Sequence, residues 1–276
     1  MKKILLIDGY NLIYRARYSG MNRGEHSTIY NYFRGLRPIV EKFNPDLAFM
    51  ILEGRPVKRL EMHPEYKGQR QYHNKDDFER QKLEIIDMSN KYFPIQILRH
   101  ENYECDDVIG YLAEKYKAEN KVTILSSDTD FIQCIDDNVE LYNPVSKKFL
   151  EKPNYDYVLY KSLRGDNSDN IDGFKGIGDK RAQKLSLDPD KLSEFLISEG
   201  YKEKLDKNMK MIKLHDLTEE KDNIIYFNKP SRDWDIVKDK FNEYRFSSMI
   251  NEKSWNKFTN TFENLWRNIW QIIIAC

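Results

Sequence analysis

Cysteine is scarce in this chain: of its 276 residues, only Cys105, Cys134 and Cys276 carry a thiol. Three scattered cysteines do not build a disulfide framework or a zinc knuckle, so the sequence predicts a reducing, cytoplasmic setting. An excess of charge is also missing, because 45 Lys and Arg balance 45 Asp and Glu. The zero sum excludes an overall basic protein and leaves room for a local basic surface.

Long apolar runs are missing as well. The first run, residues 4–7, is broken by Asp8, which is too early for a signal peptide. The C-terminal segment NIWQIIIAC is far shorter than a membrane span, so we expect no membrane association and a core or docking role for it. With 276 residues, the chain can bury one large core or two unequal ones.

What the chain does contain is an alternation of short apolar runs with segments of helical spacing. The runs span residues 3–7, 47–52, 95–98 and 122–125, and the helical segments span residues 28–43, 78–93 and 106–117. This order predicts an α/β fold with a mostly parallel central sheet flanked by helices. Beyond Asn143 we expect only helices. We place a boundary near Pro153, with an α/β core over residues 1–152 and a helical part over residues 153–276.

Carboxylates gather where the predicted strands end. Asp8, Glu53 and Asp128 each follow or closely trail an apolar run. The stretch 103–131, YECDDVIGYLAEKYKAENKVTILSSDTDF, adds Glu104, Asp106, Asp107 and Asp130. Carboxyl ends of parallel strands meet at one edge of a sheet, where two unit charges about 4 Å apart repel by roughly 4 kcal/mol. Such a cluster needs protons or hard cations, of the Mg²⁺ or Mn²⁺ type. Taken singly, each Asp also fits a helix N-cap, which is the commoner role.

A glycine-rich turn lies in the second half of the chain. RGDNSDN, which begins at Arg164 and contains Asp166 and Asp169, leads into GFKGIGDKR. This pattern is typical of a helix-hairpin-helix over residues 164–187, whose second helix begins near Asp179. Free backbone N–H groups at such a turn, with lysines beside them, suit a DNA phosphate. A P-loop is the alternative, but no GK[ST] follows at the required spacing and no strand precedes the turn.

Basic and aromatic residues alternate over residues 55–70, RPVKRLEMHPEYKGQR. This composition is typical of a channel for single-stranded nucleic acid, in which charge follows the backbone and rings stack on bases. A solvated surface loop is the alternative, and this stretch by itself favours the loop.

Together these motifs resemble those of the 5′ nuclease (flap endonuclease) family. LIDGYN, VKRLEMHPEYKGQR, YECDDVIG, ILSSDTDF and GDNSDNIDGFKGIGDKRA occur in the family's order and approximate spacing, over about residues 3–184. The family includes the nuclease domain of bacterial DNA polymerase I and the free-standing phage 5′-3′ exonucleases, some known as phage ribonuclease H. The unfused chain looks more like the phage enzymes. Cys105 occupies the small-residue position of the family's E-A-D-D signature.

The resemblance implies a PIN-like 5′ nuclease core, with a helical arch over about residues 66–92. It implies a structure-specific 5′-3′ exonuclease and flap endonuclease that acts near 5′ ends of duplex DNA in replication or repair. RNA primers and RNA–DNA hybrids are further substrates that it suggests. The alternatives are a catalytically inactive DNA-structure-binding protein and a PIN-like ribonuclease for single strands. The retained carboxylates argue against the first, and the helix-hairpin-helix and YKGQR segments argue against the second.

The resemblance also assigns site residues. The metal ligands would be Asp8, Glu53, Glu104, Asp106, Asp107, Asp128, Asp130, Asp166 and Asp169, with Glu53 in place of the usual Asp. Lys67 would lie near the scissile phosphate, and Tyr66, Arg70 and Arg59 would guide the strand. Further DNA contacts would come from Arg15, Lys175, Gly176, Gly178, Lys180 and Arg181.

Two Mg²⁺ ions, for which Mn²⁺ could substitute, would activate water and neutralise the phosphate. Glu104, Asp106, Asp107 and Asp130 would hold the first ion, Asp128, Asp166 and Asp169 the second, and Asp8 and Glu53 would orient them. K⁺ is expected at the helix-hairpin-helix. The partner would be DNA with a 5′ flap or 5′ end, bound by a monomer. The aromatic residues Phe246, Trp255, Phe258, Phe262, Trp266 and Trp270 are spaced like a buried helical face, with docking of a replication protein as the alternative.

Overall fold

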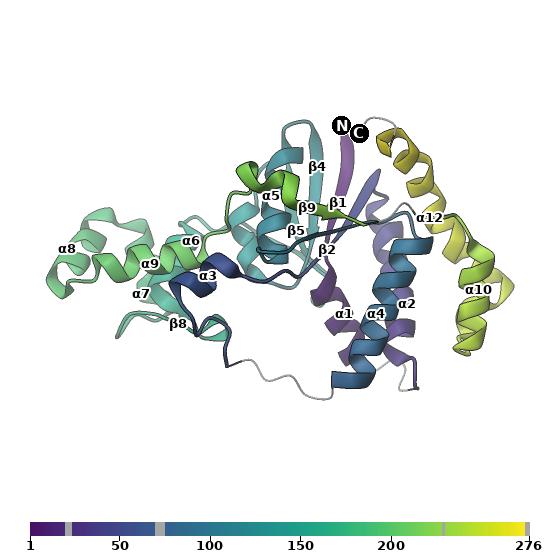
Figure 1. The fold of residues 1–276 in the computed structure, drawn as a ribbon. Coiled ribbons are helices and arrows are strands. Elements are labelled where there is room, and N and C mark those ends of the chain that lie inside the picture. Colours follow the sequence, from purple (N-terminus) through teal and green to yellow (C-terminus); the bar gives the residue numbers. More distant parts are fainter. Residues whose placement is uncertain (20–23, 70–74, 228–229, 274–276) are drawn as a thin grey trace.

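A seven-stranded sheet forms the centre of the computed structural model, which describes residues 1–19, 24–69, 75–227 and 230–273 (Figure 1). Its strands are β1 (Lys2–Asp8), β2 (Leu47–Leu52), β3 (Gln96–His100), β4 (Asn120–Leu125), β5 (Val139–Asn143), β6 (Lys148–Leu150) and β9 (Ile224–Tyr226). They lie in the order β6-β5-β4-β1-β2-β3-β9. The pairings from β5 to β3 are parallel, and the edge strands β6 and β9 are antiparallel. The predicted mostly parallel sheet is confirmed.

Helices cover both faces of this sheet. Helices α1, α2 and α4 pack on one face and α5 on the other. The helices of the described residues are α1 (Gly9–Tyr18), α2 (Ser27–Phe43), α3 (Val57–Met62), α4 (Lys75–Tyr92), α5 (Cys105–Lys117), α6 (Tyr157–Arg164), α7 (Asp179–Leu187), α8 (Pro189–Glu199), α9 (Lys202–Ile212), α10 (Trp234–Glu243), α11 (Ser247–Ile250) and α12 (Glu252–Ile273). Short 3₁₀ helices are η1 (Thr129–Cys134), η2 (Asn167–Asp169) and η3 (Thr218–Asn223), and β7 (Gly165–Asp166) pairs with β8 (Ile171–Asp172). Within the described residues, no helix combines the length and the apolar character that crossing a membrane requires.

Strand β1 is continuously apolar over residues 4–7, because both of its faces are buried there. Leu5 and Ile7 point into the core under α1, α2 and α4, whereas Ile4 and Leu6 point into the core under α5. A strand in a parallel sheet covered on both sides cannot alternate with polar residues. This is why the continuous runs in the sequence located the central strands.

The chain changes direction across the sheet at β1, which has β2 on one side and β4 on the other. Such a switch point leaves a crevice at the carboxyl ends of the strands. Asp8 is the last residue of β1 and therefore lies at this crevice.

Helices α6 to α9 build a second lobe with a core of its own. Leu163, Phe174, Ile177 and Leu205 are buried together there. In Figure 1 this lobe lies on one side of the sheet, and α10 and α12 lie on the other. A small cluster that includes Tyr66, with Leu60 and Met62 of α3 packed against it, joins the lobe to the sheet domain.

One expectation for the C-terminal half is wrong. The chain after Asn143 is not purely helical, because β6, β7, β8 and β9 follow it. Residues beyond 153 also contribute to the α/β core: β9 pairs with β3, and Phe258 and Phe262 of α12 share the core of Phe33 in α2. Five of the six aromatic residues predicted as core, Phe246, Trp255, Phe258, Phe262 and Trp266, are buried. The side chain of Trp270 lies outside the described residues.

Helix α4 forms the second half of the segment predicted as an arch. Its side chains Phe78, Ile85 and Met88 are buried in the core shared with α2, so this half is a layer of the sheet domain and does not stand free. Residues 70–74, in the middle of the predicted arch, lie outside the described part of the chain.

Candidate metal centre

The predicted carboxylates, except for Asp107, line two adjoining cavities at the carboxyl ends of the strands. The larger cavity, of about 920 Å³, takes its acidic wall from Asp8, Glu53, Glu104, Asp106 and Asp128. The smaller one, of about 320 Å³, is lined by Asp106, Asp128, Asp130, Asp166 and Asp169. Lys67, Asp106 and Asp128 belong to both walls, so the two cavities meet along these residues.

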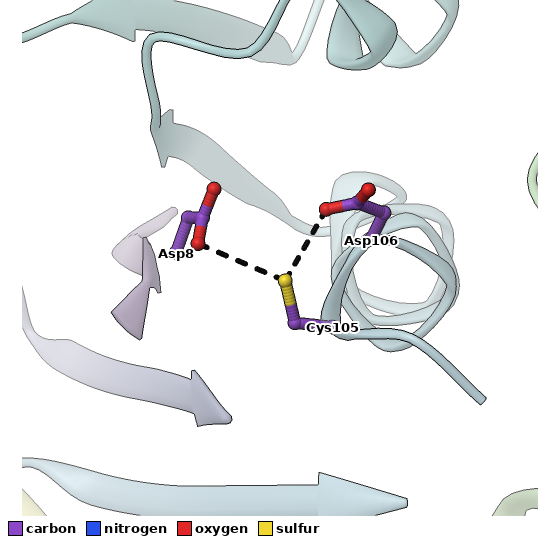
Figure 2. Close-up of side chains that lie close together, drawn as sticks. All are labelled: Asp8, Cys105 and Asp106. Atoms are coloured by element: carbon purple, nitrogen blue, oxygen red, sulfur yellow. Dashed lines mark hydrogen bonds between the residues drawn. The ribbon is translucent and has the colours of Figure 1, made fainter. Parts of the chain in front are cut away.

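Two groups of ligand atoms are compact enough to hold an ion each. The first group is Asp8, Cys105 and Asp106, each of which offers one atom within 4.8 Å of the others. Figure 2 shows the Cys105 thiol between the two carboxylates, with Sγ 3.2 Å from Asp106 Oδ1 and 3.7 Å from Asp8 Oδ1. The Ser126 hydroxyl donates to Asp8 Oδ2 at 2.7 Å, and the backbone N–H of Asn11 donates to Oδ1 at 3.1 Å.

The second group is Asp130, Asp166 and Asp169, again with one ligand atom each within 4.8 Å. A buried lysine lies inside it: the Lys161 ammonium binds Asp130 and lies 2.6 Å from Asp166 Oδ2. Sequence reasoning missed Lys161. The sequence gives little indication that Lys161 belongs to the site, because a lysine in the last turn of a helix is usually solvated or interacts with the helix dipole.

Burial and crowding raise the pKa of the carboxyls in the first group and of the neighbouring Glu53. Burial raises the pKa of Asp8 to about 6, although the Ser126 hydrogen bond opposes this. Burial, and then the charge of Glu104, raise the pKa of Glu53 to about 7. Burial and the charge of Asp128 raise the pKa of Asp106 well above its ordinary value. A divalent cation would relieve both causes, so this set of buried oxygen donors fits a hard cation.

The second group is neutralised in a different way. Burial raises the pKa of Asp130 to about 6 even though the Lys161 charge lowers it. For Asp166, the hydrogen bond and charge of Lys161 outweigh burial and bring the pKa below its ordinary value. The same two carboxylates raise the pKa of Lys161 against the effect of its burial. In the second group, the Lys161 ammonium therefore offsets negative charge, whereas the first group responds to its charge by a higher affinity for protons.

Tyr66 and Lys67 come from the loop after α3 and contact Asp169 of the second group and Glu104 of the larger cavity. Lys67 has φ 56°, a left-handed conformation that is uncommon outside glycine, and its N–H donates to the Asp169 carbonyl at 3.2 Å. The Lys67 ammonium binds Glu104 and lies 3.8 Å from Asp169 Oδ2. The Tyr66 hydroxyl lies 2.9 Å from Asp169 and 3.1 Å from Glu104. Since Tyr66 is buried against these carboxylates, it holds them, and its predicted role in guiding the strand stays a prediction.

Two predicted site residues instead bind each other. Asp107 is fully buried, and its carboxylate accepts from Arg59 Nη1 at 2.6 Å and Nη2 at 2.9 Å. It also accepts from the His215 backbone N–H at 2.8 Å. The structure thus places Asp107 and Arg59 against each other and not in the cavity walls, and their predicted roles in metal and DNA binding stay predictions. Asp106 and Asp107 are adjacent on α5, where successive residues point about 100° apart, so one faces the cavity and the other faces Arg59.

Of the two other arginines predicted to contact DNA, the structure describes only Arg15, which does not line either cavity. Arg15 of α1 is half-buried, and a side chain at Gly35 of α2 would approach its guanidinium to 3.9 Å. Arg15 therefore faces α2 and not the carboxylates. Arg70 lies outside the described residues, so its predicted role stays a prediction.

The glycine-rich turn connects α6 and α7 at the surface of the second lobe. The N–H of Ile177 donates to the Phe174 carbonyl at 3.0 Å, and Gly176 inside this turn has φ 73°, which glycine adopts without strain. Helix α7 begins at Asp179 as predicted, and a side chain at Gly178 would meet nothing within 4 Å. Basic side chains around the turn are exposed: Lys175, Lys180 and Arg181. The predicted role of this segment in DNA binding stays a prediction.

At this centre, the same carboxylates cap helices and line the acidic cavities. Asp8 caps α1, Asp128 caps η1 and Asp166 caps η2, each by accepting a backbone N–H. Each of these carboxylates also lines a cavity. One oxygen can hold the helix start while the other faces the site, so both interpretations of the sequence apply to the same residues.

Comparisons with known proteins place these residues in context. Residues 3–161 match the family model described as 5′-3′ exonuclease, N-terminal resolvase-like domain. A 5′-3′ exonuclease of Mycoplasmopsis pulmonis is 34% identical over 203 residues, which cover 67% of this chain and 66% of the relative. A 5′-3′ exonuclease of Aquifex aeolicus is 28% identical, with 91% of this chain and 95% of the relative covered. DNA polymerase I of Thermus filiformis is 33% identical, but only 23% of the polymerase is covered.

Solved structures agree on the fold. The flap endonuclease of bacteriophage T5, in a complex with DNA and metal ions, superposes with a TM-score of 0.64 at 19% identity, with 97% of this chain and 99% of that chain covered. A zinc-bound 5′-exonuclease of the same phage also gives 0.64, at 20% identity, with 77% and 90% covered. At such identity the likeness concerns the fold.

Proposed function

Because this chain belongs to the 5′-3′ exonuclease family, whose N-terminal resolvase-like domain it matches over residues 3–161, we propose that it hydrolyses phosphodiester bonds near the 5′ ends of duplex DNA. It acts as a structure-specific 5′-3′ exonuclease and flap endonuclease in replication or repair. The observation that carries the proposal is the convergence on two joined cavities of carboxylates from β1, α5, η1, β7 and η2 and from the segments that follow β2 and β4. The relatives named as 5′-3′ exonucleases support it.

The cofactor is Mg²⁺, with Mn²⁺ as a substitute, because the donors are buried carboxylate oxygens. Asp8 and Asp106 would hold one ion with help from Glu53, Glu104 and Asp128, which line the same cavity. The second group would hold the other: Asp130, Asp166 and Asp169. When bound, such a pair of cations neutralises charge on the phosphate and makes water a stronger nucleophile at neutral pH.

Lys67 supplies positive charge to the reacting phosphate. Its ammonium lies where the two cavities meet and already binds an anionic oxygen of Glu104. A phosphate in either cavity therefore lies within reach of this side chain. Lys67→Ala should lower kcat by about 10²–10³-fold, the usual effect of removing one transition-state charge partner. Single-turnover cleavage of a labelled flap measures it, and the exposed Lys121→Ala is the matched control. Unchanged cleavage would remove Lys67 from the proposal.

The second lobe grips the duplex away from the cut. Lys175, Lys180 and Arg181 are exposed around the free start of α7, where backbone N–H groups suit phosphate, and K⁺ would bind at this turn. Contacts of this kind position DNA without reading its sequence. Binding should weaken steeply with salt although the net charge of the whole chain is zero.

The test is digestion of 5′-labelled flap, nicked and RNA-primed duplexes with Mg²⁺, followed by measurement of product lengths. The proposal expects short products from the 5′ end and no products after chelation of the metal. Binding of flap DNA without any cleavage would favour the inactive DNA-binding alternative. Cleavage of single-stranded RNA alone would favour the PIN-like ribonuclease.

A further inference from the structure

Arg59 is a buried guanidinium with every N–H direction in use. Its side chain is only 4% exposed, and it donates five hydrogen bonds. Two go to the Asp107 carboxylate and one to Glu104 Oε2, at 2.8 Å. Two go to backbone carbonyls, Met211 at 2.9 Å and Lys213 at 3.3 Å. A planar fork with five donors is needed for this set, and the single ammonium of a lysine cannot reproduce it.

These bonds join three segments that are far apart in the chain. Arg59 lies on α3, its carboxylate partners lie at the start of α5, and its carbonyl partners lie at and just after the end of α9. The His215 N–H closes the link from the α9 side by donating to Asp107 Oδ1 at 2.8 Å. Helix α9 is part of the second lobe, whose core includes Leu205. The guanidinium therefore lies between the second lobe and the acidic centre.

The hydrogen bonds of Arg59 also reach Glu104, a residue of the acidic centre. Glu104 is buried, and its two oxygens are shared among Arg59, Tyr66 and Lys67. Tyr66 and Lys67 belong to a loop whose partners, such as Asp169, also lie on the lobe side. Arg59 is the partner that connects Glu104 to the segment after α9. If that segment shifted, the guanidinium would shift with it, and the Glu104 carboxylate would lose its orientation.

We infer that Arg59 is a positioning residue that sets the second lobe relative to the acidic centre and thereby orients Glu104. The inference rests on the proposed function. If the second lobe binds the duplex, its position relative to the acidic centre decides where the 5′ strand meets the carboxylates, so that position must be fixed. Arg59 touches neither substrate nor cation in this role. It acts through Glu104 and Asp107.

The test separates positioning from simple stability. Arg59→Met alone would leave the Asp107 charge buried without a partner, which destabilises proteins strongly. The pair Arg59→Met with Asp107→Asn removes both charges together and keeps an acceptor for the His215 N–H. Arg59→Lys keeps the charge and loses the fork. Lys58→Met is the matched control, since Lys58 is the exposed neighbour of Arg59 on α3.

Four measurements are made on the full chain: thermal unfolding, Mg²⁺ affinity by calorimetry, hydrogen exchange of the segment 211–216, and kcat and KM on a flap duplex. The double variant should unfold cooperatively, exchange faster in that segment, and bind Mg²⁺ about 10- to 100-fold more weakly, as expected for loss of a ligand-orienting group. Its kcat should fall about 10²-fold, because small misplacement of reacting groups has effects of that size. The exchange rate, Mg²⁺ affinity and kcat of Arg59→Lys should lie between those of the double variant and those of the wild type. Lys58→Met should match the wild type in all of them.

A folded double variant with wild-type Mg²⁺ affinity, exchange and kcat would overturn the inference. If the double variant does not fold, Arg59→Lys decides: unchanged affinity and exchange in that protein would overturn the inference equally. If the wild type cleaves no duplex, the proposed function fails. Mg²⁺ affinity and exchange would then still decide whether Arg59 orients Glu104.

Discussion

The two halves of the acidic centre solve the same electrostatic problem differently. In the half made by Asp8, Cys105 and Asp106, burial raises the pKa of both carboxyls, so these groups bind protons more readily than free carboxylates do. In the half made by Asp130, Asp166 and Asp169, the Lys161 ammonium binds two of the three carboxylates. A cation entering the first half releases protons, whereas one entering the second must displace an amine. The halves should therefore respond differently to pH and to mutation.

The largest effect is expected from removing one carboxylate charge from each half. Asp106→Asn and Asp130→Asn should each lower Mg²⁺-dependent cleavage by at least about 10²-fold, because both halves are needed to neutralise the phosphate. Single-turnover assays on a labelled flap measure the loss, with the exposed Asp137→Asn as control. If Asp130→Asn kept near wild-type cleavage, the second half would not take part in the chemistry.

Proton loading of the first half predicts a pH-dependent stability of the metal-free protein. The folded pKa of Asp8, about 6, lies above its ordinary 3.8, so the folded state binds more protons than the unfolded state between these values. Raising pH from about 4 to 7 removes those protons at a cost, and the contribution of Asp8 to the unfolding free energy falls by roughly 1–3 kcal/mol. Asp8→Asn should lack this part of the pH dependence. Urea unfolding in EDTA at several pH values measures it, and identical pH profiles for both proteins would contradict the assignment.

Lys161→Met tests whether the ammonium in the second half competes with Mg²⁺. Without the ammonium, Asp130 and Asp166 have no competing cation, and affinity for Mg²⁺ in the second half should rise about tenfold, given the strength of charge pairing at low dielectric. Calorimetric titration measures the affinity, after circular dichroism has checked folding. Lys121→Met, at an exposed position, should leave it unchanged. Weaker Mg²⁺ binding in Lys161→Met would mean that the lysine supports the site and does not compete for it.

The smallest effect concerns the thiol in the first half. Sulfur prefers soft cations, so Cys105→Ala should weaken Cd²⁺ binding about tenfold and change Mg²⁺ binding by less than about twofold. Competition of Cd²⁺ against Mg²⁺ in a calorimeter reports the difference. Cys134→Ala removes a thiol outside this cluster and serves as the control. Equal Cd²⁺ affinity in Cys105→Ala and the wild type would show that the thiol makes no contact with the ion.

The central fold could be predicted because its strands are buried on both faces. β1, β2 and β4 appear in the sequence as continuous apolar runs, and their ends locate Asp8, Glu53 and Asp128. The edge strands could not be found in the same way. β6 and β9 are three residues each, and they exist only because β5 and β3 offer them partners. Pairing between distant segments leaves no local pattern.

Charge pairing inside the site was the other part that the sequence did not reveal. Carboxylates after strands can be placed at one edge by topology alone, but which lysine or arginine reaches them depends on side-chain packing. Lys161 was therefore not predicted as a site residue, and Arg59 was predicted without its pairing to Asp107. Asp106 and Asp107 show the limit most simply: identical neighbours in sequence face different surroundings, because a helix rotates between them.

The position of α12 has a consequence for the order in which the protein can fold during synthesis. Phe258 and Phe262, late in the chain, complete the same core as Phe33 and Phe93, which are translated much earlier. Until residue 262 has left the ribosome, the core between the nascent sheet and helices α1, α2 and α4 lacks the part of its cover that α12 provides. Exposed apolar surface of that kind invites aggregation and chaperone binding. The nascent chain should therefore depend on chaperones until translation has passed α12, and nuclease activity should appear only after that point.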